Sequence, residues 1–394
     1  MKIRLAIILL LLLGSFGAGY AQLRQADHSD RYRSLIPEDK QNRLKNIDFI
    51  ANMQYNFRND FQDGNYLASQ FKMEQFRLEI KGWVTDRVFF RFRHRYTSPF
   101  EPQTMDKIIK GVDLGFVTVK LNDKWSLTAG KQCADWGGIE FDMNPAYIYE
   151  YSDIIEMADN FLSGVQLSYA HSDKNSFGLQ ILNSRTQSFE DIYGEDIIIG
   201  GDVKQSKAPL AGVVTWRGNF GNFTTLYSYS VFTEAEGYFK NYFAMGNQLT
   251  LKNLKLSYDF KISFEDLDRT GIVSQTIPRD QYNYTLTNTM YCSHWIQAEW
   301  KFKQKWQLAL VGFSDGANWM GDEDPTKTTN NIRKAYGYIP TIEYFPWDDI
   351  DLKFFAGYVG RIYRYSDYAK EKTGVADYQT GRVMFGFISA LKFL

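Results

Sequence analysis

Apolar and polar residues alternate along most of the chain after Ile47. In Leu254–Glu265 every even-numbered residue is apolar or aromatic and every odd-numbered residue is polar, over twelve consecutive positions. Residues 47–57 repeat this alternation with Ile50 as the one exception, and residues 350–362 gather apolar side chains at even positions. A period of two residues is that of a β-strand with two different faces, and a helix with 3.6 residues per turn cannot imitate it. The pattern predicts an all-β protein.

Extended along the chain, this alternation predicts about sixteen strands. They lie near 46–57, 69–84, 86–97, 108–121, 124–132, 161–171, 175–183, 208–218, 221–233, 237–251, 253–264, 288–302, 305–314, 332–345, 349–364 and 379–393. Seven of the connections are tight turns, and they alternate with eight loops. The loops fall near 58–68, 98–107, 133–160, 184–207, 234–236, 265–287, 315–331 and 365–378. Short turns at one end and longer loops at the other are typical of an up-and-down outer-membrane barrel.

Alternation alone does not say which face is buried, because a soluble β-sandwich alternates equally well. Strands of about 10–14 residues match a tilted bilayer crossing, whereas soluble strands average about five or six. Six of the nine tryptophans lie beside the short turns, as expected for a belt at one membrane interface. The final strand places Val383, Phe385, Phe387, Leu391 and Phe393 on one parity, and Phe393 next to the last residue resembles the signal read by the outer-membrane insertion machinery. These features favour a transmembrane antiparallel β-barrel with its polar parity facing the lumen.

The first 21 residues have the composition of a signal peptide. Lys2 and Arg4 precede the apolar run Leu5–Leu13, and Gly19, Tyr20 and Ala21 supply a cleavage site before Gln22. Nine apolar residues are too few to span a bilayer as a helix. We therefore expect a signal peptide over 1–21, a short periplasmic segment over 22–45 and the barrel over 46–394. Lys and Arg total 45 against 46 Asp and Glu, which argues against a nucleic-acid-binding protein.

The polar parity supplies the candidate channel-lining residues. Strand 86–97 carries Arg91, Arg93 and Arg95 on one face, and arginine on the lipid face would cost about 2–4 kcal/mol at the bilayer midplane. These three side chains therefore face the lumen, although pairing with acids on neighbouring strands is an alternative to an open basic surface. The further candidates on polar parities are Arg77, Glu79, Lys81, Lys255, Asp259, Lys261, Lys353 and Arg361.

The loop over 133–160 is acidic and contains no Lys or Arg. Its apolar and aromatic residues are too many for a solvated loop tip, so we expect it to fold into the barrel and form a constriction, with an ordinary external loop as the alternative. Such a loop would place its carboxylates opposite the arginine row and leave a modest ion preference. The candidate constriction residues are Asp135, Glu140, Asp142, Glu150 and Asp153.

Two short motifs resemble a known family. Gly130-Lys131-Gln132 followed by Trp136-Gly137-Gly138 resembles the segment that opens the constriction loop in porins related to the phosphate-selective porins, and Glu343-Tyr344-Phe345-Pro346 resembles a late strand of the same family. The resemblance implies a sixteen-stranded and trimeric channel whose third loop bends inward. It also implies an arginine ladder, here Arg91, Arg93 and Arg95. The acidic third loop departs from the basic eyelet of anion-selective members.

These observations predict a passive outer-membrane channel for small hydrophilic solutes or ions, including anions such as phosphate. A plugged barrel acting as an adhesin or assembly scaffold is the first alternative, and a barrel-embedded lipid hydrolase using His94 or His171 is the second. The four histidines form no metal-binding motif, so we expect no catalytic centre, cofactor or metal. The expected partners are outer-membrane lipid and lipopolysaccharide, the insertion machinery, permeating solutes and two further copies of the chain.

Overall fold

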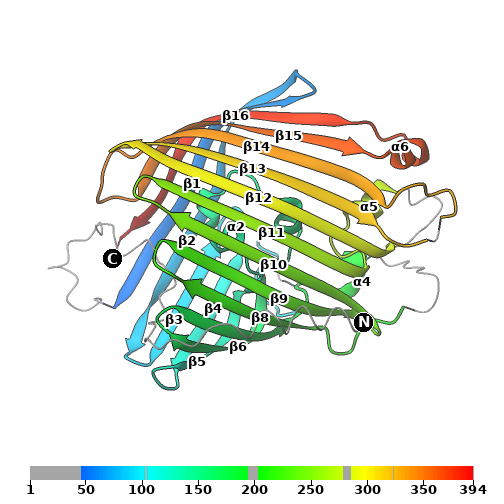
Figure 1. The fold of residues 1–394 in the computed structure, drawn as a ribbon. Coiled ribbons are helices and arrows are strands. Elements are labelled where there is room, and N and C mark those ends of the chain that lie inside the picture. The colour runs from blue at the N-terminus through cyan, green and yellow to red at the C-terminus, as the bar shows by residue number, and fades with distance from the viewer. Residues whose placement is uncertain are drawn as a thin grey trace.

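The computed structural model describes residues 46–101, 103, 105–193, 203–277, 285–322 and 324–393. Sixteen strands form a closed barrel in which each strand pairs with its sequence neighbours and β1 pairs with β16 (Figure 1). The strands are β1 Ile47–Gln62, β2 Asn65–Thr85, β3 Val88–Arg95, β4 Val112–Lys120, β5 Trp125–Cys133, β6 Phe161–Ser172, β7 Asn175–Asn183, β8 Leu210–Asn219, β9 Phe223–Ala235, β10 Tyr238–Thr250, β11 Leu254–Leu267, β12 Thr287–Lys303, β13 Trp306–Trp319, β14 Asn331–Tyr344, β15 Leu352–Tyr365 and β16 Tyr378–Lys392. The short helices are α2 Ile139–Asp142, η3 Pro145–Tyr147, α3 Asp153–Glu156, α4 Phe189–Tyr193, α5 Ile272–Thr276 and α6 Asp367–Thr373.

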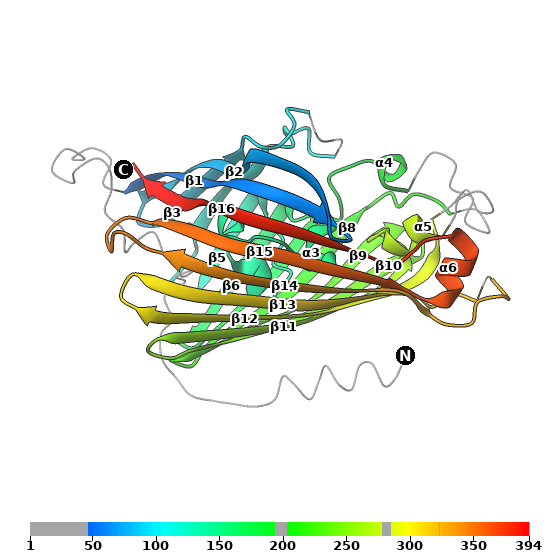
Figure 2. The ribbon, with the colours of Figure 1, turned by 90° about the horizontal axis from the view of Figure 1, so that it is seen from above.

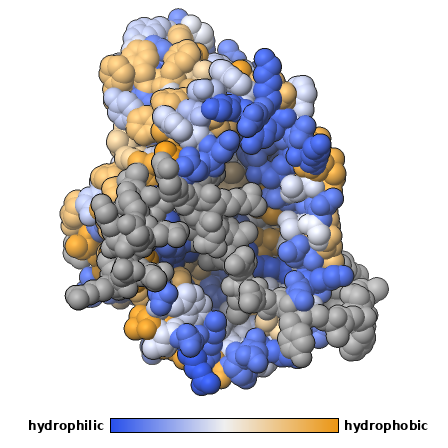
Figure 3. All heavy atoms as spheres, turned by 90° about the vertical axis from the view of Figure 1, so that its left-hand side faces the viewer, coloured by the Kyte–Doolittle hydropathy of each residue, from blue (hydrophilic) through white to orange (hydrophobic). Residues whose placement is uncertain are grey.

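The predicted fold class is confirmed, and so is the strand count. The long loops that carry α4, α5 and α6 lie at one end of the barrel, and the short turns lie at the other (Figures 1 and 2). Seen from the short-turn end, many hydrophilic residues lie toward the inside of this face, and hydrophobic residues gather along its outer edge (Figure 3). No helix in the described part of the chain is long and apolar enough to cross a membrane. The predicted signal peptide and the segment 22–45 lie outside the described residues.

The prediction of a long loop over 58–68 is wrong. β1 and β2 continue as a ladder up to the pair Gln62↔Asn65, and only Asp63 and Gly64 turn between them. Both turn residues have positive φ, 49° and 81°, which is the conformation that an Asp-Gly hairpin favours. Ring contacts extend the ladder, with the Phe57 and Phe71 centroids 4.9 Å apart. The turn signal was present in the sequence, but the polar residues around it obscured the strands.

The barrel closes through its last strand. β16 pairs with β1 over the registers Ile50↔Lys392 to Gln62↔Thr380, and the backbone N–H of Phe393 donates to the carbonyl of Phe49 at 2.8 Å. An open strand edge would leave unpaired backbone groups in hydrocarbon, so this pairing is a condition of the fold. Phe385, 53% exposed, lies on the outer face, as the apolar parity predicted.

Candidate channel constriction

A group of basic side chains on β2 and β3 forms one part of the inner wall. Six of the predicted residues form three cross-strand pairs between β2 and β3. The pairs are Arg77 with Arg95, Glu79 with Arg93, and Lys81 with Arg91. Alternate residues on a strand are about 6.6–7 Å apart, so the row from Arg91 to Arg95 extends over roughly 13 Å. The Arg91 and Arg95 side chains keep exposures of 20% and 30%, so part of this basic surface faces the lumen solvent.

The arginines of this wall share two carboxylates. Arg91 lies 2.9 Å from Glu79, and Arg77 donates through Nε to Asp113 Oδ2 at 2.8 Å. Asp113 is fully buried and also lies within 3.5 Å of Arg93 and Arg95. The alternative of pairing with acids on neighbouring strands is therefore confirmed. Among the residues that the structure describes, four arginines thus share two carboxylates.

Asp113 is a residue that the sequence pattern misplaces. Arg93 pairs with Leu114 and His94 pairs with Val112, so Asp113 is the extra residue of a β-bulge in β4. A bulge re-aims the side chain of its extra residue and breaks the period of two. Simple alternation would place Asp113 with Val117 and Val119 on the lipid side. The one local indication of the bulge in the sequence is the cost of placing the Asp113 carboxylate on the lipid side.

The third loop folds into the barrel, as predicted. Gly137 and Gly138 turn the chain inward with φ values of 78° and 91°, a region that side-chain-bearing residues rarely adopt. A Cβ on Gly137 would meet Ser228 Oγ at 2.6 Å, and one on Gly138 would meet Asp259 Oδ2 at 2.9 Å. The two glycines of the sequence motif therefore allow the loop to approach β9 and β11 closely.

A buried ionic cluster fixes the first turn of this loop. The backbone N–H groups of Ile139 and Glu140 donate to the two carboxylate oxygens of Asp259 at 2.7 and 2.8 Å. Lys261 forms an ion pair with Glu140, and its Nζ lies 3.4 Å from Asp259. Glu140 also accepts from the N–H and the hydroxyl of Ser152, both at 2.7 Å. All three charged side chains are fully buried, so this cluster positions the loop and is not part of an open charged surface.

A second cluster anchors the far part of the loop on β13, β14, β15 and β16. Arg361 donates to Asp153 at 2.7 Å and to Asp315 at 3.0 Å, and Arg333 also pairs with Asp153. Glu150 accepts from Arg382 at 2.8 Å. The two loop carboxylates are therefore matched by three guanidinium groups of the wall.

The remaining predicted loop acids share one arginine. Arg217 of β8 lies 2.6 Å from Asp135 and 2.9 Å from Asp142. Asp142 keeps an exposure of 42%, so it is the most open of the five predicted loop carboxylates. The five predicted loop carboxylates pair with lysine and arginine residues of β8, β11, β14, β15 and β16, and their position opposite the arginine row stays a prediction.

The last two predicted wall lysines lie apart from these clusters. Lys353 donates to Glu343 at 2.6 Å, and the hydroxyl of the loop residue Tyr149 donates to the same carboxylate at 3.0 Å. Lys255 pairs with Glu299 at 2.5 Å near the short turn between β11 and its predecessor. Lys353 therefore helps to seat the loop, whereas Lys255 lies close to the short-turn end.

Among the loop residues, Glu156 combines solvent exposure with an altered acidity. The pKa of Glu156 is raised above its ordinary value of 4.5, chiefly because the surrounding protein reduces the solvation of the carboxylate. The negative charge of Glu150 is the second cause. Burial likewise raises the pKa of the Tyr151 hydroxyl, which stays neutral near Arg77. Glu156 therefore takes up a proton at a higher pH than an ordinary glutamate does.

The hydrolase alternative receives no geometric support from the two histidines that suggested it. His94 packs between Tyr96 and Phe100, with ring centroids 4.5 and 5.4 Å away. The His171 ring nitrogen lies 3.4 Å from the Tyr169 hydroxyl. In the described ranges, no group of three His, Cys, Asp or Glu side chains could hold a metal ion, and Cys133 and Cys292 are both free thiols.

Comparison with known proteins identifies this architecture. Residues 48–387 match the model of the phosphate-selective porin O and P family. The chain belongs to that family. It is an outer-membrane porin of a Gram-negative bacterium, a passive channel, as the resemblance implied. No curated relative matches it in sequence.

Solved structures share the fold at low identity. The outer-membrane channel DcaP of Acinetobacter baumannii is 10% identical with a TM-score of 0.57, over 95% of this chain and all of that one. OmpF of Salmonella typhi, in complex with daunomycin, is 13% identical with a TM-score of 0.55, over 86% of this chain and 97% of that one. The anion-selective porin of Comamonas acidovorans is 10% identical with a TM-score of 0.54, over 88% and 99%.

Proposed function

We propose that this porin passes small hydrophilic solutes with a preference for anions, and that the arginine wall of β2 and β3 sets that preference. The observation that carries the proposal is the arrangement of charges among the described residues of the lumen, where part of the arginine row keeps contact with solvent. Arg77, Arg91, Arg93 and Arg95 share Glu79 and Asp113, whereas the five predicted loop carboxylates each have a basic partner. The family match supports the same direction.

The physical reason lies in the narrow setting of these charges. Inside a water-filled lumen with protein walls, field lines are focused and a small excess of one sign raises the local concentration of the opposite ion. From the sequence alone, the loop carboxylates are expected to offset the positive charge of the arginine row. Since those carboxylates are paired with other bases, we propose that the arginines dominate the field and that guanidinium groups keep it at any working pH.

We further propose a homotrimer in the outer membrane, in contact with lipid and lipopolysaccharide and inserted by the barrel insertion machinery. The predicted signal peptide over 1–21 and periplasmic segment over 22–45 belong to the same proposal. Support for assembly comes from the fold shared with a trimer form of OmpT of Vibrio cholerae, at 11% identity and a TM-score of 0.50.

The test is the reversal potential of the purified porin in a planar bilayer under a potassium chloride gradient. We expect discrete conductance steps and a reversal potential displaced toward chloride. A reversal potential displaced toward potassium would contradict the assigned preference. Absence of any conductance step would favour the plugged barrel, in which the barrel acts as an adhesin or scaffold.

A further inference from the structure

The hairpin of β1 and β2 rises beyond the barrel wall next to it. The ladder between β2 and β3 ends at the pair Arg77↔Arg95, whereas β2 continues in register with β1 as far as Asn65. In Figure 1 the tip of this hairpin stands out beyond β16 at the top of the view. We call the part of β2 beyond its pairing with β3, Asn65–Gln75, the open edge. Among the described residues, no strand pairs with it on the side away from β1.

The open edge is exposed on both faces of the hairpin. Every residue from Asn65 to Met73 is exposed, whereas exposed and buried residues alternate along β14. The exposed side chains include large apolar ones, since Tyr66, Leu67 and Phe71 are 60%, 59% and 70% exposed. This part of the hairpin therefore stands clear of the rest of the molecule.

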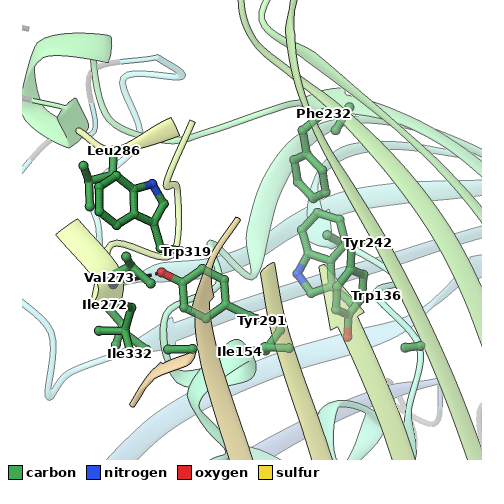
Figure 4. Packing of buried hydrophobic residues seen from close by; sticks show 14 of the residues in the cluster. Trp136, Ile154, Phe232, Tyr242, Ile272, Val273, Leu286, Tyr291, Trp319 and Ile332 are labelled. Carbon is green, nitrogen blue, oxygen red and sulfur yellow. Dashed lines mark hydrogen bonds between the residues drawn. The ribbon is translucent and has the colours of Figure 1, made fainter. Parts of the chain in front are cut away.

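Large apolar side chains inside the barrel are packed in a different way. Trp319 and Tyr291, for example, lie in a buried cluster with Ile332 and the residues of α5 (Figure 4). The aromatic residues of the open edge have no such cover within the described part of the chain, so a surface of this kind is available for contact with a partner.

The position of the open edge relative to the membrane follows from the length of β2. Trp83 lies at the short-turn end of this strand, where we expect the interfacial tryptophan belt. At about 3.3 Å per residue and a strand tilt of about 40°, Gln75 lies roughly 20 Å above Trp83 and Asn65 roughly 45 Å above it. The apolar band of an outer-membrane barrel is about 25 Å tall. The open edge therefore begins within this band and continues beyond its outer limit.

Neither environment suits an uncovered edge. At its lower end, backbone N–H and C=O groups without a partner would face hydrocarbon, where each costs several kcal/mol. At its upper end, aromatic and aliphatic side chains would face water, and an exposed apolar patch outside the membrane is typical of a protein contact. A partner that itself crosses the membrane covers both ends.

The charged side chains of the two hairpin strands are already paired within the hairpin. Arg58 donates to Asp60 at 3.0 Å and to Glu74 at 2.9 Å, and Lys72 lies 3.1 Å from Glu74. Two bases are thus matched by two acids. A second copy of the same surface can therefore approach without repulsion between like charges.

The size of the hairpin also fits a contact between subunits. The open edge is roughly 35 Å long, and a ribbon of two strands is about 10 Å wide. Its two faces together offer roughly 700 Å², close to the value of about 800 Å² per partner that is typical of a stable interface.

From the open edge, its exposed apolar side chains and its balanced charges, we propose that the hairpin of β1 and β2 is a contact surface between copies of this chain and packs on the adjacent barrel. A second copy fits because its barrel crosses the same apolar band and its loops reach beyond it. The inference rests on the homotrimer proposed above and names a surface that holds the copies together.

Photo-crosslinking of the full chain in outer-membrane vesicles tests this contact. In one variant p-benzoylphenylalanine, a photoreactive amino acid, replaces Phe71. In the matched variant it replaces Phe264, an exposed residue of β11 on the far side of the barrel from β2. We expect irradiation to join the first variant into dimers and trimers of this chain and to leave the second monomeric on a denaturing gel. No adduct at position 71, an adduct with lipopolysaccharide alone or with a different protein, or equal yields from both positions would overturn the proposal.

A pair of variants tests the same surface by assembly. Tyr66→Ser with Phe71→Ser removes two apolar side chains from the open edge, and Phe264→Ser with Ile296→Ser removes two from the outer face of β11 and β12. We expect the hairpin variant to raise the monomer fraction in mild detergent at least tenfold and the matched variant to assemble like the wild type. Heat-modifiable migration on gels shows that each barrel has folded. Wild-type assembly of a folded hairpin variant would contradict the assignment.

Assembly and conduction fail independently. A wild-type porin that is trimeric but forms no adduct at position 71 would leave the homotrimer standing and remove the hairpin as its contact surface. A monomeric wild-type porin would remove both, while its conductance steps and reversal potential would still decide the channel proposal.

Discussion

Charged side chains are paired differently on the two sides of the lumen. On β2 and β3, four arginines share two carboxylates, and two of the arginines keep contact with lumen solvent. On the side where the third loop is anchored, charges are matched in buried clusters, of which Lys261, Glu140 and Asp259 form the most enclosed.

The difference shows that the same residue types serve two purposes. A buried ion pair gains little net stability, since desolvation consumes most of the attraction, but it fixes one geometry because an unpaired member is costly. The arginine row, which keeps partial contact with lumen solvent, instead retains an electrostatic field that acts on a passing solute. Acidic residues in a constriction loop therefore do not by themselves predict cation preference.

The largest expected effect follows from breaking the most enclosed cluster. Lys261→Met leaves Glu140 and Asp259 buried without their cation and should destabilise the loop by about 3–5 kcal/mol. Single-channel conductance should rise or become noisy as the loop loses its contacts with the inner wall. The double variant Lys261→Met with Glu140→Gln should recover part of the quiet signal, and an unaltered conductance in the single variant would show that the cluster does not hold the loop.

A smaller effect is expected where the loop turns inward. Gly138→Ala places a Cβ 2.9 Å from Asp259 Oδ2 and requires a positive φ, so both strain and contact act against it. Gly221→Ala is the matched control, because Gly221 has φ 77° but open space around it and should lose only about 1–2 kcal/mol. Thermal unfolding followed by gel migration should rank Gly138→Ala as the less stable variant. The reverse ranking would remove the close approach as the reason for the motif.

The smallest effect concerns pH. Because the pKa of Glu156 is raised, this carboxylate takes up a proton at a higher pH than an ordinary one as the solution is acidified. The lumen then loses one negative charge, so the reversal potential should move further toward chloride as the pH falls. Glu156→Gln should show part of that displacement already at pH 7 and a weaker pH response, whereas Glu371→Gln on α6 should behave as the wild type. Identical pH responses in all three proteins would contradict the role of Glu156.

Much of the barrel could be predicted from the sequence, because the side-chain period of two belongs to the strand itself. The exceptions are places where another local rule dominates. Asp63 and Gly64 turn the first hairpin so tightly that a predicted loop becomes a strand pair, and the bulge at Asp113 turns a carboxylate inward against the alternation.

The site was harder to predict, for a different reason. Arg217, Arg333 and Arg382 were not among the predicted channel-lining residues, yet each of them binds a loop carboxylate. Those partners depend on the path of the loop across the barrel. Glu140 and Lys261, for example, form an ion pair although they are 121 residues apart in the sequence. Long-range pairing of this kind has no local signature in the sequence.

The measurement that tests the unequal pairing most directly compares two variants by reversal potential in the same salt gradient. Arg91→Ala with Arg93→Ala removes two charges from the arginine wall, and Asp142→Asn removes the most open of the five predicted loop carboxylates. We predict a large displacement toward potassium for the arginine double variant and a small displacement toward chloride for Asp142→Asn, because Arg217 already offsets that charge. Displacements of equal size, or a larger one for Asp142→Asn, would contradict the account.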